Sequence, residues 1–206
     1  MAKQKRILYA TTNPSKVVRM QEILRPISLE ILNLIDFGQT EQIHEDGRTP
    51  EANAIKKARY HFERVGIPTL AVDAGLTIER FPSHLQPGNF VRRIYGTDHQ
   101  ASDDELLDYY AKTLESYGGQ SKGLWITSLA LMVSSSKIHP ITITSETKFV
   151  AKKSPVVMPG EPLNSLQVDP VSGKYFSEMT AAQRVSALKT RTSGIFDFFQ
   201  EHWHEI

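Results

Sequence analysis

The sequence predicts an α/β fold, and three observations lead to that prediction. Two patterns alternate along the chain. In some segments apolar and polar residues alternate, as in strands, and in others apolar residues recur at three- and four-residue steps, as in helices. An apolar run at residues 7–10 leads directly into a helical segment with a capping residue. The 206 residues are 40% hydrophobic, which is enough to bury one substantial core. We therefore expect one domain.

The turn after the first apolar run has residues suited to binding a phosphate. Asn13 can cap the helix that follows, Pro14 fits its first turn, and Lys16 falls where the unpaired amides gather. Such a turn directs N–H groups, the positive end of the helix dipole and a lysine at one point. The turn lacks the glycines of a Walker loop, and capped helices also follow strands in proteins without a ligand. Because a phosphate is the natural occupant of such a turn, nucleotides are nevertheless the first substrate class to test.

The next elements continue the alternation of helix and strand. A helical pattern over residues 16–25 is followed by a strand pattern over 27–34, and a second helix runs from Pro50 to a stop at Gly66. A short buried strand then covers residues 69–73, and Ala74 and Gly75 are expected to close it. Asp73 would stand at the carboxyl end of this strand, where ligands gather in open α/β sheets.

The second half predicts a helix, a hairpin and a final helix. Ser102 and Glu105 have the spacing of a capping box, and strand patterns over residues 125–133 and 138–150 flank a serine turn. Pro140 is expected at a sheet edge or a bulge. The proline-rich stretch 153–172 is either a loop over a site or a surface connection. Thr180 and Gln183 form another capping box, which begins a helix that Ser193 and Gly194 are expected to interrupt.

Composition excludes several classes of function. The formal net charge of +1 provides no broad field for a nucleic-acid polymer or an anionic membrane. The absence of cysteine excludes disulfides, thiolate catalysis and zinc sites that use cysteine. No apolar run resembles a signal peptide or a membrane span, so we expect a cytoplasmic protein. The histidines lack metal-ligand spacing, and His202 and His204 are expected to be solvated in the tail.

Acidic residues near the second helix are candidates for a metal site. Glu45 and Asp73 flank the helix that carries Asn53 and Lys57, so the fold could gather them around a divalent ion such as Mg²⁺. Glu45 and its neighbour Asp46 could equally form a solvated turn. Asp73 is harder to explain in that way, because burying an unpaired acid directly after an apolar strand is costly.

Five short motifs in order resemble the inosine triphosphate pyrophosphatase family, and a sixth near the carboxyl terminus also fits. They are T-x-N-x-x-K (Thr11, Asn13, Lys16), E-x-G (Glu45, Gly47), N-A-x-x-K-A (from Asn53), A-x-D-x-G-L (from Ala71), P-G with an arginine (Pro87, Gly88, Arg93) and G-K-x-F-x-E-M (from Gly173). The resemblance implies an ITPase-like α/β fold, with a central mixed β-sheet flanked by helices and two lobes with a cleft between them. All 206 residues would form a single domain of two lobes.

The resemblance also implies an activity. Members of the family hydrolyse a nucleoside triphosphate to the monophosphate and pyrophosphate with Mg²⁺, usually as homodimers. Lys16, Lys57 and Asp73 would be catalytic, and Glu45 and Asp73 would hold the metal. The positions expected to bind substrate are Thr11, Thr12, Asn13, Lys16, Asn53, Ala74, Gly75, Arg93, Lys174 and Ser186. The expected partner is a small nucleoside triphosphate, with no nucleic-acid polymer and no membrane.

Several positions depart from the family pattern. Val72 replaces the first of two adjacent acids, and an ungapped alignment sets Leu163 and Asn164 against a stacking aromatic and an aspartate. Ala187 and Leu188 replace the histidine and arginine that read the purine base. Losing one base stack and one charged hydrogen bond would weaken binding of a deaminated purine on the order of 10²–10⁴-fold. The sequence therefore predicts altered base preference.

Three interpretations remain open. The chain is a Mg²⁺-dependent pyrophosphatase with altered base preference, or it keeps inosine or xanthosine triphosphate as substrate through other contacts. Alternatively it is a nucleotide-binding or structural descendant without turnover. The retained Asn13, Lys16, Lys57 and Asp73 argue against the last interpretation, and Val72 argues for it.

Overall fold

A computed structural model describes residues 4–39, 41, 43–96 and 99–206 of the chain. The strands are β1 (Lys5–Tyr9), β2 (Leu29–Asn33), β3 (Thr69–Ile78), β4 (Gln120–Ser134), β5 (Lys137–Val150) and β6 (Gln167–Val168). The α-helices are α1 (Pro14–Ile23), α2 (Pro50–Val65), α3 (Asp103–Ser116), α4 (Ala181–Ala187) and α5 (Lys189–Glu201). Short 3₁₀ turns include η1 (Leu34–Phe37), η2 (Ser83–Leu85), η3 (Pro162–Ser165) and η5 (Trp203–Glu205).

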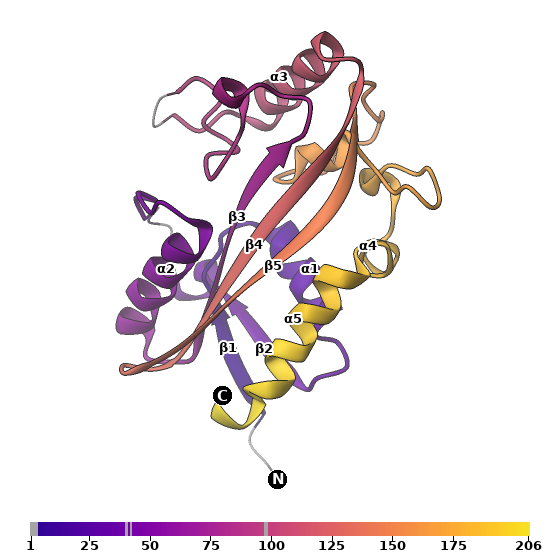
Figure 1. Cartoon of the computed structure of the whole chain (residues 1–206). Coiled ribbons are helices and arrows are strands. Elements are labelled where there is room, and N and C mark those ends of the chain that lie inside the picture. The colour runs from indigo at the N-terminus through magenta and orange to yellow at the C-terminus, as the bar shows by residue number, and fades with distance from the viewer. Residues whose placement is uncertain (1–3, 40, 42, 97–98) are drawn as a thin grey trace. The chain divides into compact units, whose positions relative to one another are not determined.

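The described strands form one mixed sheet in the order β2-β1-β3-β4-β5-β6 (Figure 1). β1 pairs in parallel with β2 and with β3, whereas β5 pairs antiparallel with β6. The prediction of an α/β fold with a central mixed sheet is therefore confirmed. No helix within the described ranges has both the length and the apolar character needed to cross a membrane.

The contacts between residues divide the chain into two compact units. Unit 1 comprises Met1–Ala74, Thr127–Ile143 and Leu188–Ile206, and unit 2 comprises Gly75–Ile126 and Thr144–Ala187. Three strands therefore contribute to both units. The expectation that the whole chain forms a single two-lobed domain stays a prediction.

In unit 1, small residues let α2 pack closely against the sheet. Ala54 and Ala58 are fully buried on one face of α2, where they contact Ala71 of β3 and Ala130 of β4. Figure 1 shows α2 on one side of the strands of unit 1, with α1 and α5 on the other side. The placement of α2 decides which side chains can meet β3, and this determines the site described below.

Unit 2 has an apolar core of its own. The apolar face of α3 packs there against the second half of β3 and against residues from β5 and η3. The buried members of this core are Leu76, Ile78, Phe81, Ala101, Leu106, Leu107, Tyr110, Ala111, Leu114, Phe149, Ala151, Leu163 and Leu166. The stretch 153–172 is thus more than a surface connection, because Leu163 and Leu166 belong to this core.

Local signals placed the helix starts correctly. Asn13 caps α1 by accepting a hydrogen bond from the Ser15 N–H at 2.9 Å. Ser102 and Glu105 form the expected capping box at α3. Thr180 and Gln183 bond each other in the same reciprocal way ahead of α4, over 2.9 and 3.2 Å. Pro140 lies in the part of β5 outside its pairing with β6, as expected for an edge.

The prediction that Ala74 and Gly75 close the third strand is wrong. β3 continues through both residues to Ile78, so Asp73 lies within the strand and not at its carboxyl end. Leu76 and Ile78 are fully buried, and Leu76 exchanges two backbone hydrogen bonds with Gly88, at 2.9 and 3.0 Å. Burial and pairing of these residues outweigh the low strand propensity of glycine.

The predicted interruption of the last helix at Ser193 and Gly194 is also wrong. The helical segment divides instead at Leu188, between α4 and α5, and Gly194 lies inside α5. A Cβ atom at position 194 would lie 3.0 Å from Cδ1 of Ile143 on β5. Gly194 therefore serves the close packing of α5 on the sheet and does not break the helix.

Candidate functional site

The periodicities of β3 and α2 bring polar side chains together. Residues two apart in a strand share one face, so Asp73 lies on the same face of β3 as Ala71, which contacts α2. Residues four apart share one face of a helix, so Asn53 and Lys57 lie beside the buried alanines of α2. Asp73 and the two α2 side chains therefore face each other across this packing.

Lys57 is the centre of the arrangement. Its ammonium group donates to Glu45 Oε1 at 2.9 Å, to the Val72 carbonyl at 3.1 Å and to Asp73 Oδ1 at 3.4 Å. The side chains of Lys57 and Asp73 are only 13% and 12% exposed, and that of Glu45 is 29% exposed. We call Glu45, Asn53, Lys57 and Asp73 the Lys57 cluster. It gathers two carboxylates around one cation, in a place with little water.

Asn53 fixes the orientation of Asp73. This asparagine is 1% exposed, and its Nδ2 donates to Asp73 Oδ2 at 2.9 Å. Its Oδ1 accepts from the backbone N–H of Gly47 at 2.7 Å. The Gly47 contact identifies the oxygen of the amide, and therefore the side that donates to the acid. A Cβ atom at Gly47 would lie 2.4 Å from Asn53 Oδ1, so this position requires glycine.

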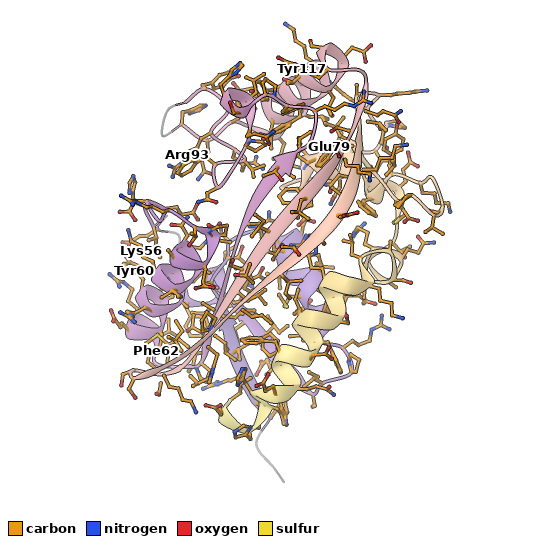
Figure 2. All side chains as sticks on the ribbon, in the orientation of Figure 1. Lys56, Tyr60, Phe62, Glu79, Arg93 and Tyr117 are labelled. Atoms are coloured by element: carbon orange, nitrogen blue, oxygen red, sulfur yellow. The ribbon has the colours of Figure 1, made fainter. Side chains whose placement is uncertain are left out.

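A second lysine and acid on the same elements form an exposed pair. Lys56 donates to Asp46 Oδ1 at 2.7 Å and to the His44 carbonyl at 2.9 Å. The side chains of Lys56 and Asp46 are 43% and 57% exposed, and the hydrogen bond from Lys56 lowers the pKa of Asp46. Figure 2 shows Lys56 and Tyr60 on the outward side of α2. Substitutions in this exposed Asp46–Lys56 pair can therefore serve as controls for substitutions in the Lys57 cluster.

The loop after β1 leaves the sheet at the same end as Asp73. β1 ends at Tyr9 opposite Leu70 of the parallel β3, and the Ala10 N–H donates to the Leu70 carbonyl at 2.8 Å. Thr11 Oγ1 accepts from the Asn13 N–H at 3.1 Å, which shapes the turn. Thr12 is exposed and Lys16 is half-buried in the first turn of α1. That these residues share one pocket with Asp73 stays a prediction.

Ala74 ends the first segment of unit 1, and the remaining predicted substrate contacts lie in unit 2. Gly75 is buried within β3. The Arg93 guanidinium lies 4.7 Å from the ring centre of Phe90, over which it stacks. Lys174 and Ser186 are exposed, the latter on α4. Their contact with a substrate stays a prediction.

The donors of the Lys57 cluster fit a hard divalent cation. Glu45 Oε1 and Asp73 Oδ1 already converge on one positive group, the ammonium of Lys57. Mg²⁺ needs only one or two protein carboxylates when substrate phosphates and water complete its six ligands. Val72 cannot add a third carboxylate, and its carbonyl is directed at Lys57.

Two features were not predicted from the sequence, one in the Lys57 cluster and one away from it. Gly47 was recognised only as part of a motif, although its N–H orients Asn53. The prediction that His202 is solvated is wrong, because its side chain is 14% exposed and stacks on His139. The spacing of His202 and Glu205 could have indicated a local pair, but His139 comes from a distant strand.

Comparison with known proteins shows which family the sequence matches. The sequence model of the Ham1 family matches residues 7–152. A dITP/XTP pyrophosphatase of Lactiplantibacillus plantarum is 37% identical over 119 residues, which are 58% of this chain and 55% of that protein. One from Yersinia pseudotuberculosis is 28% identical over 87% of this chain and 89% of its own length. This chain thus spans about half the length of the first curated relatives that it matches.

Solved structures show the same fold. A HAM1 protein from Coxiella burnetii superimposes with a TM-score of 0.71 at 23% identity, over 96% of this chain and 99% of that one. The Ham1 protein of Staphylococcus aureus gives the same TM-score at 16% identity, over 96% and 100% of the two chains. These matches agree with the resemblance drawn from the sequence motifs.

Proposed function

The chain belongs to the Ham1 family, and on that basis we propose that it hydrolyses a nucleoside triphosphate to the monophosphate and pyrophosphate with Mg²⁺. The observation that supports this proposal most strongly is the buried Lys57 ammonium shared by Glu45 and Asp73. Phosphoryl-type transfer needs positioning and charge neutralisation more than covalent chemistry, and this cluster supplies both. The names of the curated relatives, dITP/XTP pyrophosphatase, support the same reaction class.

Each member of the cluster has a role in this proposal. Glu45 and Asp73 would hold Mg²⁺, which when bound neutralises charge on the triphosphate. Lys57 can move its ammonium from the carboxylates to a phosphate oxygen, and Asn13 and Lys16 would bind phosphates as well. Asn53 acts through Asp73 as a positioning residue, because Gly47 and Asp73 hold its two amide atoms.

Asp73 is suited to orient and deprotonate the attacking water. As the water oxygen forms a bond to phosphorus, the water proton passes to the carboxylate, and the bond to the pyrophosphate leaving group breaks. The pyrophosphate oxygen keeps the electron pair of the broken bond. The hydrogen bond from Asn53 keeps the carboxylate in one orientation for this step.

We also propose altered base preference relative to the dITP/XTP enzymes. Leu163, aligned with the stacking aromatic of the family, is 5% exposed and packed in the core of unit 2. The side chains of Ala187 and Leu188 have no hydrogen-bonding group for a purine edge. Retention of inosine or xanthosine triphosphate through other contacts is the second candidate, and the relatives' names favour it. The homodimer and the cytoplasmic location stay predictions.

One screen tests these proposals. Purified protein with Mg²⁺ is offered inosine, xanthosine, deoxyuridine and the ordinary triphosphates, and pyrophosphate release is measured. We expect release from at least one of them, with kcat/KM for inosine and xanthosine triphosphate no more than about tenfold above the others. A preference above about 100-fold for those two would support the second candidate. Absence of release, together with a raised Tm, would identify a nucleotide-binding protein without turnover.

A further inference from the structure

Two histidines and one glutamate meet away from the Lys57 cluster. His139 lies in β5, His202 follows the last turn of α5, and Glu205 lies in η5. His139 Nε2 is 3.1 Å from Glu205 Oε2, and His202 Nδ1 is 3.5 Å from Glu205 Oε1. One ligand atom from each residue lies within 4.8 Å of the other two. All three residues belong to unit 1.

These three side chains are packed into the protein and largely shielded from solvent. Their exposed fractions are 18% for His139, 14% for His202 and 12% for Glu205. The two imidazole rings are stacked with their centres 3.8 Å apart and their planes 19° apart, and the Phe198 ring packs edge-on against His202. The packing therefore places the two rings side by side, with their planes nearly parallel.

We propose that His139, His202 and Glu205 bind a divalent transition-metal ion, with Zn²⁺ the best fit. Two imidazoles and one carboxylate are the protein ligands of one class of zinc site, in which water takes the fourth position. Bonds of about 2.0–2.1 Å in a tetrahedron place ligand atoms about 3.4 Å apart. The two contacts to Glu205 are already near that spacing. The two rings would also have to turn out of their stack, because a metal ion must lie close to the plane of each imidazole that binds it.

The remaining charged groups around Glu205 are compatible with this site. Lys137 contacts Glu205 Oε2 from β5, but its side chain is 54% exposed and can move into water. The ring of His204 is 76% exposed, with its Nε2 at 3.8 Å from Glu205 Oε1, so it could replace the water ligand. A bound metal would take over the role of Lys137 as the cation beside Glu205. It would also link the carboxyl-terminal η5 turn to β5.

Metal titration of the untagged protein tests this proposal, since a histidine tag would itself bind zinc. Protein stripped with EDTA is titrated with Zn²⁺ against a chromophoric chelator, and Co²⁺ binding is followed by visible absorption. We expect one ion per chain, with excess Mg²⁺ unable to compete, because hard cations prefer oxygen ligands. His139→Gln and His202→Gln should each weaken Zn²⁺ binding at least about tenfold. Saturating Zn²⁺ should raise the Tm of the wild-type protein.

Three further variants separate this site from a general effect. Lys137→Met should tighten Zn²⁺ binding, because it removes the competing cation. His84→Gln, in the exposed part of η2, should leave binding unchanged. Asp73→Asn should also bind Zn²⁺ normally, which distinguishes this site from the proposed catalytic one. Lack of stoichiometric binding in correctly folded protein, or equal weakening by His84→Gln, would overturn the proposal.

Discussion

The Lys57 cluster of unit 1 and two aligned base-recognition positions of unit 2, Leu163 and Asn164, differ in the kind of side chain they hold. In the first region, charged groups are shielded from water and have well-defined partners. In the second, Leu163 lies in an apolar core, and the Asn164 side chain makes long hydrogen bonds, donating to Met158 Sδ at 3.5 Å and Glu161 Oε2 at 3.4 Å and accepting from Gln167 Nε2 at 3.4 Å. The proposed function therefore combines retained groups for phosphate chemistry with changed side chains at the positions aligned with base recognition.

The largest expected effect is that of Asp73→Asn. An amide cannot accept the water proton or hold a cation as a carboxylate does, so we expect kcat to fall about 10³-fold. Asparagine has nearly the same shape, so the far-UV circular dichroism spectrum should match that of the wild-type protein. Pyrophosphate release with Mg²⁺ measures the effect. Asp46→Asn is the matched control, and an equal loss in that variant would remove the distinction between the buried and exposed acids.

Lys57→Met should lower kcat about 10²-fold. It removes a positive group from the phosphate site and leaves Glu45 and Asp73 without the ammonium they share. We also expect a loss of about 2 kcal/mol in the free energy of unfolding, because the remaining carboxylates are mostly buried. Urea unfolding and steady-state kinetics measure both. Lys56→Met should change neither by more than a small amount, since its ion pair is exposed.

His61 is a buried residue of α2, and it should make the free energy of unfolding depend on pH. Burial is the main reason that its pKa falls from 6.5 to about 4, with the charges of Arg64 and Lys57 adding to the shift. Its Nδ1–H donates to Gln39 Oε1 at 2.8 Å. Because the folded pKa is lower, the unfolded chain binds more protons between pH 6.5 and 4. Stability is therefore lost as pH falls through that range, by about 2–3 kcal/mol.

The variant His61→Gln tests this pH dependence. Glutamine cannot take up a proton, so urea unfolding at pH 7 and pH 4.5 should differ less in this variant than in the wild-type protein. His84→Gln, at an exposed position in η2, should keep the wild-type difference. An unchanged difference in His61→Gln would mean that other groups cause the acid sensitivity.

The smallest expected effect is that of Leu163→Tyr, which restores an aromatic at the aligned position. Leu163 is 5% exposed among close-packed neighbours, so the larger ring should destabilise the protein by about 1–3 kcal/mol. We expect no gain in selectivity for inosine triphosphate, because the position has no open face on which a base could stack. Thermal unfolding and the triphosphate screen measure both. A clear gain in selectivity would show that the position still reaches the substrate.

The parts of the fold that could be predicted depend on local chemistry. The cap at Asn13 and the apolar run of β1 are encoded by neighbouring residues, and the structure shows the cap and the burial of Ile7, Leu8 and Tyr9. The continuation of β3 past Gly75 depends on pairing with Gly88, which a local reading cannot detect. The division at Leu188 has no proline or glycine to indicate it.

The candidate site was predictable to a similar degree. The face of α2 that carries Asn53 and Lys57 follows from helix periodicity. Glu45 and Asp73 were candidates because they flank this helix in the sequence, and the motif resemblance implied the same metal-binding role. The contact between Gly47 and Asn53 could not be predicted, because it needs the path of the backbone around the start of α2. His139 and Glu205 are separated by 66 residues, so only the three-dimensional fold brings them together.

The position of Pro140 in β5 has a consequence for how the protein behaves at high concentration. Among the described strands, β6 pairs with β5 at Lys148 and Phe149, so the amino-terminal part of β5 is a margin of the sheet outside this pairing. Such margins can recruit strands from other molecules and start fibrils. Proline has no N–H to offer an incoming strand, and the charge of Lys137 discourages close approach. This margin therefore carries its own safeguard against aggregation.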